Sequence, residues 1–347
     1  MLRQRLPIII GCFICGVIAV LSLFVASNTI KHSKNGFIRL FPPHKLSTQH
    51  VLDIRYNSYY IAGLSFNTIY LASSTAPFIF KCNYSLADSQ SIKLTLPLIK
   101  TTTPEAFHFT VDSPNIYVID RLTASVYYGD IKDSCKLAGR LDSSQFLGAI
   151  PISPNSFIIR TYDKIFGQNV LKKIELQKDN SLSKVFQLEK YHEGVFSTDG
   201  MLHYDRNTSR LVYVYYYRNQ FSVLDTNLTM VFKGKTVDTI TTPQIKVAEI
   251  KSDKINTLSA PPLVVNTKSC VFENWLFINS GLCANNENKE LFDEYSVIDV
   301  YSLDDFQYKF SFYIPKYKSE KIREFKVCNN TLIAIYSHFL VTYQLNL

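Results

Sequence analysis

A strand-like motif that recurs along the chain constrains the fold more than any other feature of the sequence. Six times an Asn opens, or shortly precedes, a run of aliphatic and aromatic residues. These are Asn67, Asn115, Asn155, Asn207, Asn274 and Asn330, at intervals of 48, 40, 52, 67 and 56 residues. A period of about 40–50 residues with four strands per repeat is typical of β-propeller blades. Asn suits this position because it tolerates the left-handed conformation of a tight turn between two strands.

The remaining strands of each repeat can be read from the same pattern. From Val51 onward, short runs rich in Val, Ile, Tyr, Phe and Thr are separated by turn-forming residues, which is typical of an all-β domain. The second repeat is the clearest example. Its predicted strands are Ala106–Val111, Asn115–Asp120, Ala124–Gly129 and Cys135–Leu141.

The two ends of the domain complement each other. The sixth repeat supplies only three strands, Arg323–Cys328, Thr331–Tyr336 and Phe339–Leu345, and a spare strand, Val51–Tyr56, precedes the first repeat. Pairing the spare strand with the last blade would close the ring and remove an open sheet edge. We therefore predict a single six-bladed β-propeller over residues 51–347. The alternatives are a seven-bladed ring that uses the extra residues Asp238–Leu263, or a pair of β-sandwiches.

An apolar segment precedes the repeats. Leu6 to Ala26 is 21 residues without a charge, long enough as a helix to cross a bilayer core of roughly 30 Å. We expect residues 1–5 to form a cytoplasmic tail and residues 6–26 a single-pass transmembrane anchor in the inner (cytoplasmic) membrane. Residues 27–50, with Pro42-Pro43, would form an extended tether to a domain in the periplasm. The alternatives are a cleaved signal peptide and a lipoprotein with its lipid on Cys12.

The positive charge of the chain lies near this apolar segment. The formal net charge is +8, but residues 1–50 hold six Lys and Arg and no acidic residue, which leaves +2 for the rest. A nucleic-acid binder would concentrate basic residues on its folded domain, so we predict no nucleic-acid partner. Basic residues beside an apolar segment suit anionic lipid headgroups instead, so the membrane is the expected partner of this region.

The sequence contains none of the common catalytic signatures. It has no GxSxG, HExxH, Walker or GxGxxG motif. The seven His residues are too dispersed for a zinc site. We therefore predict no catalytic residue, no metal site and no cofactor.

One face of the predicted ring is a candidate binding surface. In a propeller, the loops between the second and third strands of all blades share one rim. On this rim the sequence places the candidate binding residues Arg121, Arg160, Lys164, Arg218 and His338. Guanidinium groups pair with carboxylates and phosphates through two hydrogen bonds. We expect a protein, a peptide or an anionic ligand to bind at this rim.

One strand adds a resemblance to a known superfamily. Asn115-Ile116-Tyr117-Val118-Ile119-Asp120-Arg121 resembles the second blade strand of six-bladed propellers of the NHL and TolB-like types. The layout of the whole chain resembles membrane-anchored propeller proteins of Bacteroidota. The resemblance implies a cell-envelope binding or scaffold module. The alternative is a propeller hydrolase or lactonase that uses a divalent metal in the channel, since fold alone does not decide function.

Overall fold

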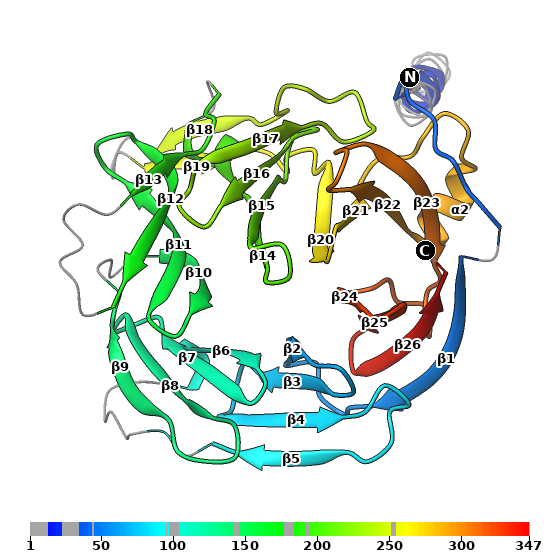
Figure 1. Cartoon of the computed structure of the whole chain (residues 1–347). Helices are drawn as coiled ribbons and strands as arrows, with labels where there is room; N and C mark the ends of the chain where they lie inside the picture. Colours follow the sequence, from blue (N-terminus) through cyan, green and yellow to red (C-terminus); the bar gives the residue numbers. More distant parts are fainter. Residues whose placement is uncertain are drawn as a thin grey trace, which may run out of the picture.

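The computed structural model describes residues 13–22, 35–43, 45–94, 96, 104–141, 146–176, 184–191, 194–250 and 255–346. Six four-stranded antiparallel sheets surround a central axis, so the chain folds as a six-bladed β-propeller (Figure 1). In each blade the strands follow one another from the channel to the outer edge, and the sixth blade takes its outermost strand from the N-terminal side of the domain.

The first three blades have the following strands, from the channel outward: β2 (Tyr59–Leu64), β3 (Ile69–Ser73), β4 (Phe78–Cys82) and β5 (Gln90–Lys93); β6 (Phe107–Asp112), β7 (Asn115–Asp120), β8 (Ser125–Asp130) and β9 (Lys136–Arg140); β10 (Phe146–Ser153), β11 (Ser156–Asp163), β12 (Gln168–Glu175) and β13 (Val185–Gln187). The last three have β14 (Gly200–Asp205), β15 (Arg210–Tyr215), β16 (Phe221–Asp225) and β17 (Met230–Gly234); β20 (Asn266–Phe272), β21 (Trp275–Ser280), β22 (Ser296–Ser302) and β23 (Tyr308–Ile314); β24 (Glu324–Cys328), β25 (Thr331–Ile335), β26 (Phe339–Leu345) and β1 (Leu46–Asp53).

The long interval between the fourth and fifth repeats does not hold a seventh blade. It contains a separate two-stranded hairpin, β18 (Val247–Ile250) and β19 (Ile255–Leu258). The next long interval contains the short helix α2 (Lys289–Glu294), whose N-terminus is capped by the side chain of Asn288. Both insertions lie in loops, so the prediction of six blades is confirmed.

The predicted closure of the ring is confirmed as well. β1 pairs antiparallel with β26, with Val51 opposite Val341, and it begins at Leu46, five residues before the expected start. Asn115 begins the second strand of its blade, and the other five Asn residues precede the second strand of theirs by one to three residues. Their expected left-handed conformation holds at Asn330, whereas Ser209 and Glu273 adopt it in the fourth and fifth blades. The spacing of the six Asn residues therefore predicted the blades better than the left-handed turn conformation that was offered to explain it.

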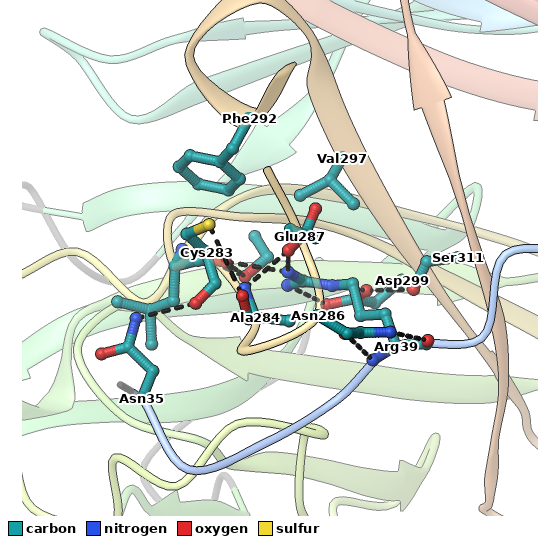
Figure 2. A network of polar contacts seen from close by, with 12 residues as sticks. Asn35, Arg39, Cys283, Ala284, Asn286, Glu287, Phe292, Val297, Asp299 and Ser311 are labelled. Atoms are coloured by element: carbon teal, nitrogen blue, oxygen red, sulfur yellow. Dashed lines mark hydrogen bonds and ion pairs between the residues drawn. The ribbon is translucent and has the colours of Figure 1, made fainter. Parts of the chain in front are cut away.

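Part of the expected tether packs on the ring as a strap, residues 35–43, against the fifth blade. Arg39 is 2% exposed and binds Asp299 of β22 through two hydrogen bonds, Nε to Oδ1 at 2.6 Å and Nη2 to Oδ2 at 2.9 Å. It also pairs with Glu287 and donates to the carbonyl of Leu282 at 2.9 Å (Figure 2). Burial alone would lower the pKa of Arg39, but the two carboxylates raise it above its usual range.

The N-terminal segment is described only in part. Residues 13–22 form a helix, and the rest of the predicted span 6–26 lies outside the described residues. Within the part of the chain that the structure describes, no helix has the length and apolar character needed to cross a membrane.

Two faces of the ring must be distinguished. The linker face carries the loops between blades and the loops between the second and third strands of each blade. These two sets of loops contact each other, as when the main-chain N–H of Arg121 donates to the carbonyl of Ala106 at 3.0 Å. The hairpin face carries the other two turns of each blade. All five candidate binding residues belong to β11 or to loops of the linker face.

Candidate functional site: the central channel

The inner strands of the six blades enclose a cavity of about 670 Å³ along the axis of the ring. Pockets that bind small ligands have volumes of about 300–1,000 Å³, so the channel is of suitable size. Its lining is mixed. It includes apolar residues such as Ile61 and Val111 together with aromatic and charged ones such as Tyr60 and Arg160.

Arg160 and Asp199 form an ion pair at the channel wall. Arg160 lies on β11, and its Nη1 is 3.1 Å from Oδ1 of Asp199, which precedes β14. Asn169 donates to the same carboxylate oxygen at 3.0 Å. Burial raises the pKa of Asp199 despite the opposing effect of Arg160. Burial would also lower the pKa of Arg160, but Tyr213 and Asp199 raise it. Arg160 is therefore a fixed cation held in place by its neighbours.

Arg121 supplies a second cation to the channel lining. It follows β7, and its guanidinium donates from Nη2 to the carbonyl of Glu105 at 2.9 Å. The residue is exposed. Its Nε also donates to the carbonyl of Ala106 at 3.4 Å, so the N–H groups that remain are the ones that can reach solvent or a ligand.

β24 adds two charges inside the channel. Glu324 and Lys326 alternate with the buried residues Phe325 and Val327, so both point to the channel side. Glu324 Oε2 accepts a hydrogen bond from the main-chain N–H of Ile61 at 3.1 Å. Burial raises the pKa of Glu324 even though Lys326 opposes that change.

Two histidines line the channel in their neutral form. Burial, with a contribution from Arg121, lowers the pKa of His108 to about 4, and its ring stacks on Tyr60 with centroids 5.1 Å apart. Burial and Lys326 lower the pKa of His203 to about 3, and its Nε2 lies 2.7 Å from Ser269 Oγ. At neutral pH the cations of the lining are therefore Arg and Lys side chains rather than imidazolium groups.

The structure brings only two of the five predicted binding residues to the channel, Arg121 and Arg160. Lys164 lies exposed at the tip of the β11–β12 turn. His338 lies in the β25–β26 loop, where its Nδ1 is 2.9 Å from Asp53 Oδ1. Neither Lys164 nor His338 belongs to the channel lining.

Arg218 is fully buried, with 0% exposure, and cannot contact a ligand at the rim. Its guanidinium donates to the carbonyls of Ser197 at 2.7 Å and Glu189 at 2.8 Å and packs over Tyr215, 3.6 Å from the ring centroid. Its role is to join the fourth blade to the preceding loop. Sequence reasoning missed this burial, because the carbonyls of Ser197 and Glu189 lie more than 20 residues away along the chain.

Sequence reasoning also missed the interior residues Glu324, Lys326, His108 and His203. Glu324 and Lys326 could have been predicted from the sequence, because polar residues at alternate positions of the first strand of a blade face the channel. In the described part of the chain, no group of three or more His, Cys, Asp or Glu residues is placed to hold a metal ion.

Comparison with known proteins identifies the fold. No protein-family model matches the chain, and no curated protein is similar to it in sequence. Among solved structures, virginiamycin B lyase from Staphylococcus aureus is 12% identical, with a TM-score of 0.50 over 87% of this chain and 100% of the lyase. A DUF4221 family member from Bacteroides vulgatus is 13% identical, with a TM-score of 0.49 over 88% and 99% of the two chains. BamB from Moraxella catarrhalis is 9% identical, with a TM-score of 0.44 over 86% and 99%. At such low identity the likeness to the lyase shows a shared fold alone.

Proposed function

We propose that this chain is a cell-envelope binding module whose channel binds a ligand with an anionic group. The proposal rests on one observation. A cavity of about 670 Å³ has Arg121 and Arg160 in its lining, and Lys326 lies deeper on β24. Arg side chains bind carboxylate or phosphate through paired, charge-assisted hydrogen bonds. Glu324 and Asp199 would disfavour a ligand with several negative charges and favour one with a single anionic group next to an apolar or cationic part.

The membrane placement belongs to the same proposal. The uncharged segment Leu6 to Ala26 would anchor the chain in the cytoplasmic membrane as a single span, with the ring on the periplasmic side. Arg3 and Arg5 before the segment agree with a cytoplasmic N-terminus.

The channel can be tested with the full chain in detergent. The probes are small monocarboxylates, phosphate monoesters, and short peptides with either a free or an amidated C-terminus. Thermal shift would find a binder, and calorimetry would then measure its affinity. We expect Arg121→Gln combined with Arg160→Gln to weaken binding about 100-fold or more, since a hydrogen bond to a charged group contributes about 1.5–3 kcal/mol.

The matched control is Arg140→Gln, which changes an exposed Arg on the outer strand β9. It should bind like the parent protein. The proposal is wrong if no probe raises the melting temperature, or if the double variant keeps the parent affinity.

A further inference from the structure

The chain reaches the ring on the linker face. Asn35, the first residue of the strap, donates from Nδ2 to the carbonyl of Cys283 at 2.8 Å, in the β21–β22 loop (Figure 2). Its own carbonyl accepts from Thr239 Oγ1 at 2.6 Å, in the linker between the fourth and fifth blades. Both partners belong to the linker face, so the strap begins on this face.

The linker face of the third blade presents apolar side chains to solvent. In the β11–β12 turn, Asp163 Oδ1 accepts from the main-chain N–H groups of Ile165 at 2.8 Å and Phe166 at 3.1 Å. These bonds fix a tight turn in which Ile165 is 90% exposed and Phe166 is 40% exposed. Neither side chain contributes to the core between blades, so the fold itself does not require large apolar residues here.

The second blade repeats this arrangement. In the β7–β8 turn, Asp120 Oδ1 accepts from the main-chain N–H of Leu122 at 2.9 Å, and Leu122 is 61% exposed. In both turns a basic residue, Arg121 or Lys164, stands between the Asp and the apolar residue. Two neighbouring blades thus project the same pair, a cation followed by a large aliphatic side chain, from the same face.

The predicted anchor limits how far this face can lie from the membrane. Eight residues, 27–34, separate Ala26 from Asn35, and two of them are Lys31 and Lys34. At about 3.3–3.6 Å per residue, they reach at most roughly 30 Å. The second and third blades lie across the ring from the point where the strap joins (Figure 1). Membrane attachment at the strap, together with membrane contact at the second and third blades, would hold the linker face parallel to the bilayer.

We propose that the linker face of the second and third blades docks on an anionic bilayer surface. Ile165, Phe166 and Leu122 enter the interfacial layer, and Lys164 pairs with lipid phosphates. Each CH₂ group buried in lipid contributes about 0.8 kcal/mol, and each basic residue near an anionic surface contributes about 1 kcal/mol. The channel opening then faces the headgroups. This inference rests on the membrane anchor of the proposed function.

The test uses the full chain in proteoliposomes of phosphatidylglycerol and brominated phosphatidylcholine, which quenches tryptophan that enters the lipid. Trp275 is first replaced by Phe to remove the native signal. Ile165→Trp then reports on the linker face, and Phe66→Trp is the matched control, because Phe66 is 89% exposed in the β2–β3 turn on the hairpin face. Both sites are exposed, so neither change should disturb folding.

We expect brominated lipid to reduce the emission of the Ile165→Trp chain about two-fold and to leave that of the Phe66→Trp chain unchanged. Adding Lys164→Glu should remove most of the quenching. The docking proposal is wrong if the chain floats with the vesicles but Trp at position 165 is not quenched. It is also wrong if Trp at position 66 is quenched as strongly as Trp at position 165. In both cases flotation would still support the membrane anchor. If the chain does not float with the vesicles, the anchor and the docking fail together.

Discussion

At the scale of single residues, Arg39 has the most consequential environment in the molecule. Its guanidinium is buried between Asp299 and Glu287, while Ser311 Oγ also donates to Asp299 at 2.5 Å. A buried ion pair adds little net stability over an apolar replacement, but removal of one partner leaves an unpaired buried charge. The strap is therefore held to the fifth blade by an interaction that is costly to break.

Arg39→Ala should lower the free energy of unfolding by about 3–5 kcal/mol, because Asp299 and Glu287 would remain buried without their cation. Urea denaturation followed by circular dichroism measures the change. Arg140→Ala removes an exposed Arg of β9 and should change the stability by less than about 0.5 kcal/mol. Equal stability of the two variants would show that water replaces the guanidinium at no cost.

His203 should make the ring sensitive to acid. Its pKa is lowered from 6.5 to about 3 in the folded chain, so between these values the unfolded chain binds more protons. The stability contributed by neutral His203 is then complete above pH 6.5 and is lost as the pH falls. His203→Gln should reduce the loss of stability between pH 6.5 and about 4 by roughly 1–3 kcal/mol. Urea denaturation at each pH, followed by circular dichroism, compares His203→Gln with the parent chain.

At the scale of the elements, the sequence predicted strands well and their long-range partners poorly. In the second blade the predicted strand Asn115–Asp120 coincides with β7, and the ends of the other three predicted strands differ from β6, β8 and β9 by one residue. Alternation of apolar residues and turn chemistry are local signals, which explains this agreement. The strap was read as a tether because Pro42-Pro43 indicates an extended chain. That reading of the backbone says nothing about Arg39, whose partner Asp299 lies 260 residues away.

The same limit applies to the candidate site. The repeat placed Arg121 and Arg218 in corresponding loops, because loop position follows from strand order, whereas Arg160 lies within β11. It could not show that the guanidinium of Arg218 turns inward to main-chain carbonyls and to Gln220. A charged residue in a predicted loop indicates on which face of the ring that residue lies. Whether its side chain can reach a ligand depends on its contacts with other blades.

Truncation should separate the contributions of the strap and of β1. A chain that starts at Asn35 should unfold like the complete ring. A chain that starts at Lys45 lacks Arg39 and should lose about 3–5 kcal/mol. A chain that starts at Ile54 also lacks β1, which exposes the edge of β26, and should aggregate or lose its sharp transition. Melting and size-exclusion chromatography follow the series. A chain from Ile54 that melts as sharply as one from Lys45 would show that β1 is not needed for closure.

At the scale of the whole molecule, the core follows the ring from blade to blade. Among the described residues, six buried apolar clusters each join two neighbouring blades, and one of them joins the sixth blade to the first through Leu71, Ile333 and Leu340. A smaller cluster fixes the strap through Phe37 and Val265. Because each blade packs on two neighbours and no blade is terminal, the loss of one interface should weaken every other. The ring should therefore unfold as one cooperative unit despite its length.

Leu71→Ala tests this expectation. Leu71 is fully buried between the first and sixth blades, and the substitution should cost about 2–5 kcal/mol. Trp275, the only Trp of the chain, lies in the fifth blade and reports on a part of the ring that the change does not touch. We expect its fluorescence transition in urea to shift to lower concentration together with the circular dichroism of the whole ring, with an unchanged m-value. If Trp275 keeps the parent midpoint while the circular dichroism shifts, the blades unfold separately, and closure by β1 does not couple them.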